Sequence, residues 1–327
     1  MYNLDDLAIV VASCDKYESV WAPYFKLFEK YFAEAPKNIY LLVENIDIPQ
    51  EVSSKWCAKL GDVNIINSTE KKWSKRIKDS IRQIDQKYIL FLLEDFFLQD
   101  FVQTDTLKKL VGWMDENEAI SAIRIYPFWE SYTNSWLKYR DNFFVIDRNY
   151  EERVNAQAAI WRKDRFVEIL NDDETAWQFE ILASNRSRKD PYLYLGYFEP
   201  LALKGIFPYQ FAPANGYGIT AGKWLWNNKQ LFEKNGIDCD FSELGIMSER
   251  EWRFHCKSKL YKTWRRVIKL INIAKVLLKS KKKTDVKHIL DNSLLRTKFQ
   301  LLDDIAYQTL SDRDLQLIDR CNDQLKP

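Results

Sequence analysis

The sequence contains very little histidine, and its cysteines are scattered. Two histidines, His255 and His288, and five cysteines occur among 327 residues, and no C-x-x-C pair is present. This composition argues against a serine–histidine triad or a histidine-rich metal centre as the main chemistry. Scattered cysteines without a pairing pattern are typical of a reducing cytoplasm. If the chain is an enzyme, we expect it to work with carboxylates.

Long apolar runs and glycine-rich phosphate motifs are also missing. No stretch approaches the roughly 18–20 apolar residues that a membrane-spanning helix needs. Met1 leads into Asp5 and Asp6 rather than into a basic and then apolar leader, so we expect no secretion. The nine glycines form neither a G-x-G-x-x-G fingerprint nor a P-loop. A dinucleotide fold of the fingerprint type and a P-loop nucleotide site are therefore not expected.

The net charge of +2 conceals an uneven distribution. From Glu251 to Lys283 there are twelve Lys or Arg and one Glu, which leaves 37 basic and 46 acidic residues elsewhere. Apolar and basic residues fall on separate stripes between Lys257 and Lys283, which predicts a basic amphipathic helix on an anionic membrane surface. A helix packed on the main domain with its basic face in water is the alternative. Because no nucleic-acid module is recognisable, we predict no nucleic-acid partner.

Hydrophobic patterning predicts an α/β fold in the first half of the chain. Short continuous apolar runs at residues 7–12, 39–43, 63–66 and 88–93 are typical of buried parallel strands. Helical periodicities separate them, which predicts a mostly parallel sheet flanked by helices on both faces. We place this domain at residues 1–245 and a basic helical extension at 246–327. Ligands of such sheets bind beyond the carboxyl ends of the strands, where Asp15, Glu44 and residues 94–95 lie.

The adjacent acids Glu94 and Asp95 are the most informative local feature. They directly follow the most apolar run, YILFLL. Two carboxylates at the end of a buried strand can hold a hard divalent cation and, through it, a diphosphate. Acids at the N-terminus of a helix, stabilised by its dipole, are an equally ordinary explanation. The pattern alone leaves both interpretations open.

The segment around these acids resembles a family. FLLEDFFL, preceded by WSKRIKDSIRQIDQKYI, is similar to segments of bacterial polysaccharide and lipopolysaccharide glycosyltransferases of the GT-A fold. The resemblance covers roughly residues 7 to 215 and implies a Rossmann-like GT-A domain. It implies that Asp95, helped by Glu94, binds Mg or Mn, although Phe96 stands where the family motif has its last acid. That departure favours a metal-independent enzyme as the alternative.

The same resemblance implies where the nucleotide-sugar donor lies. The loop after the first strand would hold the base and ribose together with the end of the second strand, and the start of the helix after residue 72 would lie near the donor. Ordinary core packing of the tryptophan and a solvated arginine are the structural alternatives there. The residues so implicated are Ser13, Asp15, Lys16, Glu44, Trp73, Ser74 and Arg76.

Glu180 is the predicted catalytic base. The resemblance implies an acid after the metal motif that deprotonates the acceptor hydroxyl, and Trp177-Gln178-Phe179-Glu180 is similar to such a segment. A hydroxyl that attacks an anomeric carbon needs a carboxylate in hydrogen-bond reach. A glutamate stabilised by a helix dipole is the structural alternative. Three rival acids, Asp172, Asp173 and Glu174, are more typical of solvated helix-capping residues. Arg186 and Arg188 could form either a phosphate site or a basic surface patch.

Taken together, these features predict an inverting glycosyltransferase. It would transfer a sugar from a nucleotide donor, with UDP favoured, to a glycan or lipid-linked acceptor, and it would be cytoplasmic and peripheral on the membrane. Aromatic residues from Tyr126 to Tyr139 and from Tyr209 to Tyr217 would line the acceptor groove. A non-catalytic glycan- or lipid-binding protein is the rival from another class.

Overall fold

The computed structural model describes residues 3–127, 136–150, 152–198, 205–209 and 218–257. Contacts divide the chain into two units, Met1–Lys262 and Thr263–Pro327, and the described residues all belong to the first. The predicted basic helix, apart from the backbone of its first residue, lies outside the described residues. So does most of the predicted aromatic groove, at residues 128–135 and 210–217.

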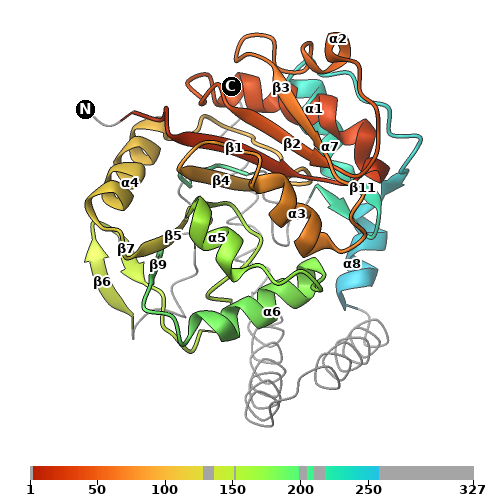
Figure 1. Ribbon diagram of the computed structural model, residues 1–327. Helices are drawn as coiled ribbons and strands as arrows, with labels where there is room; N and C mark the ends of the chain where they lie inside the picture. The colour runs from red at the N-terminus through yellow and green to blue at the C-terminus, as the bar shows by residue number, and fades with distance from the viewer. Residues whose placement is uncertain (1–2, 128–135, 151, 199–204, 210–217, 258–327) are drawn as a thin grey trace. The chain divides into compact units, whose positions relative to one another are not determined.

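The core of the described fold is a mixed sheet of nine strands in the order β3-β2-β1-β4-β8-β5-β9-β7-β6 (Figure 1). Its strands are β1 (Leu7–Ala12), β2 (Ile39–Val43), β3 (Val63–Asn67), β4 (Tyr88–Leu93), β5 (Ile120–Arg124), β6 (Leu137–Arg140), β7 (Phe143–Val145), β8 (Ala159–Arg162) and β9 (Leu193–Tyr197).

The sheet is mostly parallel, as the sequence predicts. β3, β2, β1 and β4 are parallel neighbours, whereas β8 is antiparallel to both β4 and β5. At the far edge β7 is antiparallel to β9 and β6. Within this sheet β7 and β8 therefore run against the other strands. The apolar run AQAAIW predicts a strand at β8, but it gives no signal for the reversed direction.

Helices cover both faces of the sheet, which confirms the predicted fold class. The helices of the described residues are α1 (Glu18–Tyr31), α2 (Gln50–Ser53), α3 (Trp73–Ile81), α4 (Thr104–Glu116), α5 (Lys163–Ile169), α6 (Ala176–Ser187), α7 (Trp226–Lys234) and α8 (Glu249–Lys257), with a 3-10 turn η1 at Asp15–Tyr17. In Figure 1, α3, α5 and α6 cover the face turned to the viewer.

Alternation along the strands divides the core into two layers. In β1, Leu7, Ile9 and Val11 pack on the side of α1 and α4. Ala8, Val10 and Ala12 pack on the side of α3, α5 and α6. Because β1 and β4 are buried on both faces, their sequences are continuously apolar rather than alternating. These two strands form the rigid centre from which the site projects.

A second, three-stranded sheet is attached next to β4. It contains β10 (Ile219–Thr220), β11 (Lys223–Leu225) and β12 (Ile246–Met247) in the order β10-β11-β12. The Ala221–Gly222 turn between β10 and β11 has φ values of 51° and 76°, as a two-residue hairpin turn requires. Gly218 attaches this sheet to the main one, because its N–H donates to the Asp95 carbonyl at 2.6 Å.

Candidate active site

Glu94 and Asp95 lie at the carboxyl end of β4, in the centre of the sheet. Glu94 is buried and Asp95 is partly buried. Burial raises the pKa of Glu94 well above its usual value, and the neighbouring Asp95 raises it further. Burial also raises the pKa of Asp95, to about 7. The pair therefore resists ionisation unless positive charge is brought to it.

One oxygen of this pair has no partner. Asp95 Oδ1 is buried and accepts no hydrogen bond from the residues that the structure describes. The hydroxyl of the buried Tyr24 is likewise without a described partner, and its pKa is raised first by burial and then by the charges of Glu94 and Asp95. Buried acceptors without donors are rare because losing water is unfavourable. An orphaned carboxylate oxygen beside a second carboxylate fits a cation ligand.

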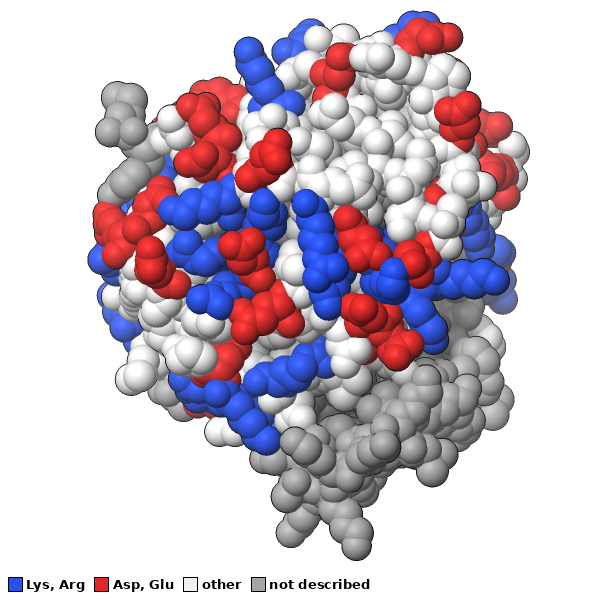
Figure 2. Space-filling view, in the orientation of Figure 1, with Lys and Arg blue, Asp and Glu red and all other residues white. Residues whose placement is uncertain are grey.

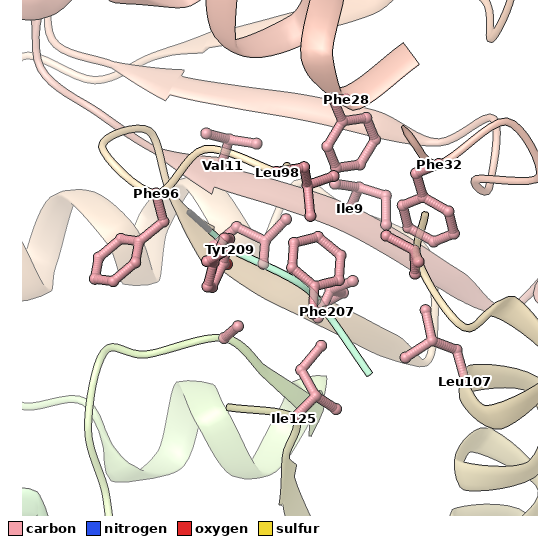
Figure 3. Packing of buried hydrophobic residues seen from close by; sticks show 14 of the residues in the cluster. Ile9, Val11, Phe28, Phe32, Phe96, Leu98, Leu107, Ile125, Phe207 and Tyr209 are labelled. Atoms are coloured by element: carbon pink, nitrogen blue, oxygen red, sulfur yellow. The ribbon is translucent and has the colours of Figure 1, made fainter. Parts of the chain in front are cut away.

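Phe96 does not extend this acidic pair. Its ring is 1% exposed and packs against Tyr209 at a centroid distance of 5.0 Å (Figure 3). The chain thus enters the hydrophobic core directly after Asp95. Residues 3–127, 136–150, 152–198, 205–209 and 218–257 contain no group of three His, Cys, Asp or Glu side chains that could hold a metal ion. A cation at Asp95 would need oxygen ligands from a substrate or water.

Ser13, Glu44 and Arg76 link the carboxyl ends of β1 and β2. Arg76 extends from α3, donates to the Ser13 carbonyl at 3.2 Å and forms an ion pair with Glu44. The Ser13 hydroxyl accepts from Trp21 Nε1 at 2.7 Å and lowers the pKa of Glu94. The Arg76 charge lowers the same pKa. Arg76 is 6% exposed, so this cation is buried beside the acidic pair rather than solvated.

Asp15 is held by the backbone at the end of β2. Its carboxylate accepts from the N–H groups of Glu44 and Asn45, both at 2.9 Å. The Asp15 N–H in turn donates to Glu44 Oε2 at 3.3 Å. Sequence reasoning assigned Asp15 and Glu44 to the donor, and the geometry adds a bracing role between two strand ends. Glu44 remains accessible, with 45% of its side chain exposed.

Lys16 points toward the small sheet. A Cβ added at Gly222 would lie 3.2 Å from Lys16 Nζ, so the ammonium stands over the hairpin turn. That turn borders an open cavity of about 620 Å³, whose described lining is Ala221, Lys223, Met247, Arg250, Glu251 and Phe254. None of the predicted site residues is among these lining residues. Lys16 alone of the predicted set is placed beside the cavity.

Trp73 and Ser74 begin α3 on the opposite face of the sheet from α1. Trp73 packs against Phe91 and Phe179 at centroid distances of 6.4 and 5.5 Å. The Ser74 N–H donates to the Glu174 carbonyl at 3.0 Å, and the residue is fully buried. Both residues therefore have packing roles that fix the N-terminus of α3. This helix carries Arg76.

Glu180 lies at the same edge of the sheet as the acidic pair. Its Oε1 accepts from the Ala156 N–H at 3.1 Å. Ala156 immediately precedes β8, and β8 is antiparallel to β4, so the start of β8 and the end of β4 share one edge. Thr175 caps the helix that carries Glu180 by a reciprocal capping box with Gln178. Glu180 is thus held by a rigid helix start, as a positioned base requires.

The rival acids have other partners. Asp172 pairs with Lys78 at 2.8 Å, and the buried Glu174 pairs with Arg186, which also donates to the Ile169 carbonyl. The Lys78 contact joins the α5–α6 connection to α3, and the Arg186 contacts join α6 to this connection and to the end of α5. Lys, Arg, Asp and Glu are interspersed over this face rather than gathered by sign (Figure 2). The geometry of Arg186 is that of an internal ion pair.

Two polar residues at this edge were missed by sequence reasoning. Arg124 ends β5, is 8% exposed and lies 5.7 Å from the Tyr126 ring centroid. Gln157 precedes β8, and its buried Oε1 accepts no hydrogen bond from the described residues. An arginine ending the apolar run ISAIR and a glutamine inside AQAAIW are the signals that could have identified them.

Comparison with known proteins gives similarity at the level of solved structures. No protein-family model matches the sequence, and no curated protein matches it. The chain is similar to S. aureus TarS 1-349, at 13% identity over 59% of this chain and 60% of that one, with a TM-score of 0.38. It is similar to the mannosyltransferase PcManGT from Pyrobaculum calidifontis in complex with GDP-Man and Mn²⁺, at 12% identity over 96% and 85% of the two chains, with a TM-score of 0.43. A cytidylyltransferase from Leptospira borgpetersenii matches at 10% identity over 59% and 76%, with a TM-score of 0.39. At these values the chain is assigned to no family.

Proposed function

We propose that this protein is a glycosyltransferase that uses a nucleotide-sugar donor and inverts the transferred sugar. The observation that carries the proposal is the convergence of three kinds of group at one edge of the sheet. The acidic pair Glu94–Asp95 lies at the end of β4, Ser13, Glu44 and Arg76 lie at the ends of β1 and β2, and Glu180 approaches from α6. The resemblance of FLLEDFFL to the metal-binding segment of GT-A enzymes supports the same function.

Different residues at this edge would contact different parts of the donor. Glu44 and the loop from Ser13 to Lys16 would contact the nucleoside, since Glu44 is the accessible carboxylate there. Asp95 and Glu94 would hold a Mg or Mn ion on the diphosphate, because Asp95 Oδ1 is orphaned and both pKa values are raised. A bound divalent ion would supply positive charge to the departing diphosphate. Arg76 adds a fixed positive charge beside the same carboxylates.

Glu180 would accept the proton of the attacking hydroxyl. The Ala156 N–H fixes one of its oxygens, which orients the carboxylate. In the inverting reaction that we propose, this base would act on the face of the sugar opposite the leaving diphosphate. Trp177, three residues earlier on the same helix and 65% exposed, offers an aromatic surface for a sugar ring. The acceptor would be a glycan or a lipid-linked glycan precursor.

The association with an anionic membrane surface remains a prediction. It rests on the basic sequence from Lys257 to Lys283, beyond the described residues apart from the backbone of Lys257. None of the helices in the described part of the chain has the length and apolar character that crossing a bilayer requires.

A metal-independent glycosyltransferase is the second candidate. The burial of Phe96 and the absence of a three-ligand group from the described ranges favour it. In that case cationic side chains would stabilise the diphosphate, and Arg76 and Arg124 are two buried cations among the described residues at this edge.

A panel of UDP-, GDP-, CMP- and dTDP-sugars tests the proposal. Thermal stabilisation and slow donor hydrolysis are measured with Mn, Mg or EDTA on the wild type, Asp95→Ala and a control variant, Asp62→Asn, at an exposed acid. We expect one nucleotide class to respond, the response to need metal, and Asp95→Ala to abolish it while Asp62→Asn does not. A selective response that ignores EDTA and Asp95 would support the metal-independent candidate. Silence of the wild type across the panel would refute both and favour the non-catalytic binding protein.

A further inference from the structure

Gln157 occupies a central position at the carboxyl edge of the sheet. It lies two residues before Ala159, which pairs with Phe91 of β4 on one side and with Arg124 of β5 on the other. The next residue, Ala158, still accepts from the Ile125 N–H at 3.0 Å, so the chain remains beside the end of β5 at this point. Gln157 therefore leads directly into the strand that is inserted between β4, which Glu94–Asp95 follow, and β5, which ends in Arg124.

The backbone on the other side of Gln157 is tied to the proposed base. Its preceding residue, Ala156, donates to Glu180 Oε1 at 3.1 Å. Ala156, which precedes Gln157, belongs with Ala159 and Trp161 to the core layer of α5 and α6. Phe179, next to Glu180, belongs to the same layer. The backbone that leads into Gln157 is thus held on the face of the sheet that carries α6 and Glu180.

Within the described part of the chain, the fold leaves the side-chain amide oxygen of Gln157 without a hydrogen bond. Its backbone N–H donates to Asn155 Oδ1 at 3.3 Å, which fixes the local turn. Its side-chain Oε1 is buried and accepts no hydrogen bond from the described residues. A buried amide oxygen without a donor destabilises the folded protein relative to an apolar side chain of the same shape. Because Gln157 lies at a candidate active site, a bound ligand can supply the hydrogen-bond donor that its Oε1 lacks among the described residues.

We propose that Gln157 is a specificity-determining residue that accepts a hydrogen bond from a hydroxyl group of the transferred sugar. This inference rests on the proposed function, in which the sugar lies between the diphosphate at Asp95 and the base Glu180. Gln157 follows the residue that contacts Glu180 and precedes the strand that pairs with β4, at whose end Asp95 lies. A hydroxyl donates to the amide oxygen, and a sugar that lacks this hydroxyl leaves the oxygen buried and unpaired. Discrimination against such an analogue is strong because the penalty falls on the protein group as well as on the ligand.

The test compares Gln157→Met, an apolar side chain of similar shape, with Gln83→Met at an exposed position near the end of α3. Affinity is measured for the nucleoside diphosphate alone, for its sugar conjugate and for singly deoxygenated conjugates of that sugar, and kcat/KM is measured for transfer. We expect Gln157→Met to keep the nucleoside diphosphate affinity within about twofold and to lower kcat/KM for the sugar conjugate about 10–100-fold. For one deoxy analogue the wild type should have a much lower kcat/KM than for the full sugar, whereas Gln157→Met should have the same kcat/KM for both. The reason is that removing the sugar hydroxyl and removing the Gln157 amide delete the same interaction. Gln83→Met should behave as the wild type does.

Stability separates this role from a structural one. Because the variant removes an unpaired buried acceptor, its unfolding midpoint without ligand should equal or exceed that of the wild type. A lowered midpoint together with loss of nucleoside diphosphate binding would overturn the inference and make Gln157 a packing residue. Unchanged kcat/KM and unchanged discrimination among the deoxy analogues would also overturn it. If the wild type binds nucleoside diphosphates but no sugar conjugate, the inference fails while the nucleotide site stands; if it binds neither, the proposed function itself fails.

Discussion

Replacing Asp95 by Asn should stabilise the metal-free protein above neutral pH. Burial raises the pKa of Asp95 from 3.8 to about 7. Between these values the folded protein holds a proton that the unfolded chain has released, so the free energy of unfolding falls as the pH rises through this window. About three pKa units at about 1.4 kcal/mol each give a penalty of up to about 4 kcal/mol at pH 8. The variant lacks this penalty, and the pKa of Glu94 should fall because its charged neighbour is gone.

The assay is unfolding by heat and by urea from pH 4.5 to 8.5, in EDTA and in Mn. In EDTA the two proteins should be similar near pH 4.5, and Asp95→Asn should be more stable by about 2–4 kcal/mol at pH 8. This corresponds to a midpoint shift on the order of 5 °C or more in a chain of this size. Mn should stabilise the wild type at pH 8 and leave Asp95→Asn unchanged. A wild type whose stability in EDTA rises from pH 5 to pH 8, or a variant less stable than the wild type at pH 8, would refute the reasoning.

Three further substitutions test other parts of the site. Glu180→Gln should keep the hydrogen bond from the Ala156 N–H, lower kcat at least about 100-fold in a steady-state transfer assay, and leave the nucleotide affinity measured by calorimetry unchanged. A kcat within about threefold of the wild type would exclude Glu180 as the base. Gly218→Ala should lower the free energy of unfolding by about 1–3 kcal/mol, because the added Cβ would lie 2.0 Å from Phe97 Cε2 and 3.0 Å from the Asp95 carbonyl oxygen. Urea unfolding measures this loss, and the control Ala221→Gly, at a position with positive φ, should be as stable as the wild type in the same assay. Arg76→Met should lower the free energy of unfolding by about 1–2 kcal/mol in the same experiment and weaken nucleotide binding; the loss is smaller than for a fully buried ion pair because Glu44 is half exposed. Wild-type stability together with unaltered nucleotide binding would contradict the bracing role of Arg76.

Local sequence determined the frame of the fold. The runs LAIVVA and YILFLL are apolar at every position, which only a strand buried on both faces requires, and β1 and β4 are the central parallel pair. Because parallel strands end at one edge, the polar residues that follow them had to meet there. Ser13, Glu44 and Glu94–Asp95 could therefore be brought together from the sequence before any contact was known.

Tertiary structure decided what each of these residues does. Arg76 reaches the Ser13 carbonyl across 63 residues and Asp15 reaches β2 across 29, and no local periodicity encodes such pairings. The direction of β8 was also undetermined, because AQAAIW has the same pattern in either orientation. Its antiparallel insertion between β4 and β5 brings Ala156 and Gln157 to the edge where Glu180 lies. The sequence by itself thus located the edge and the acids, while strand direction and long-range hydrogen bonding decided which side chains brace the site and which remain open to a ligand.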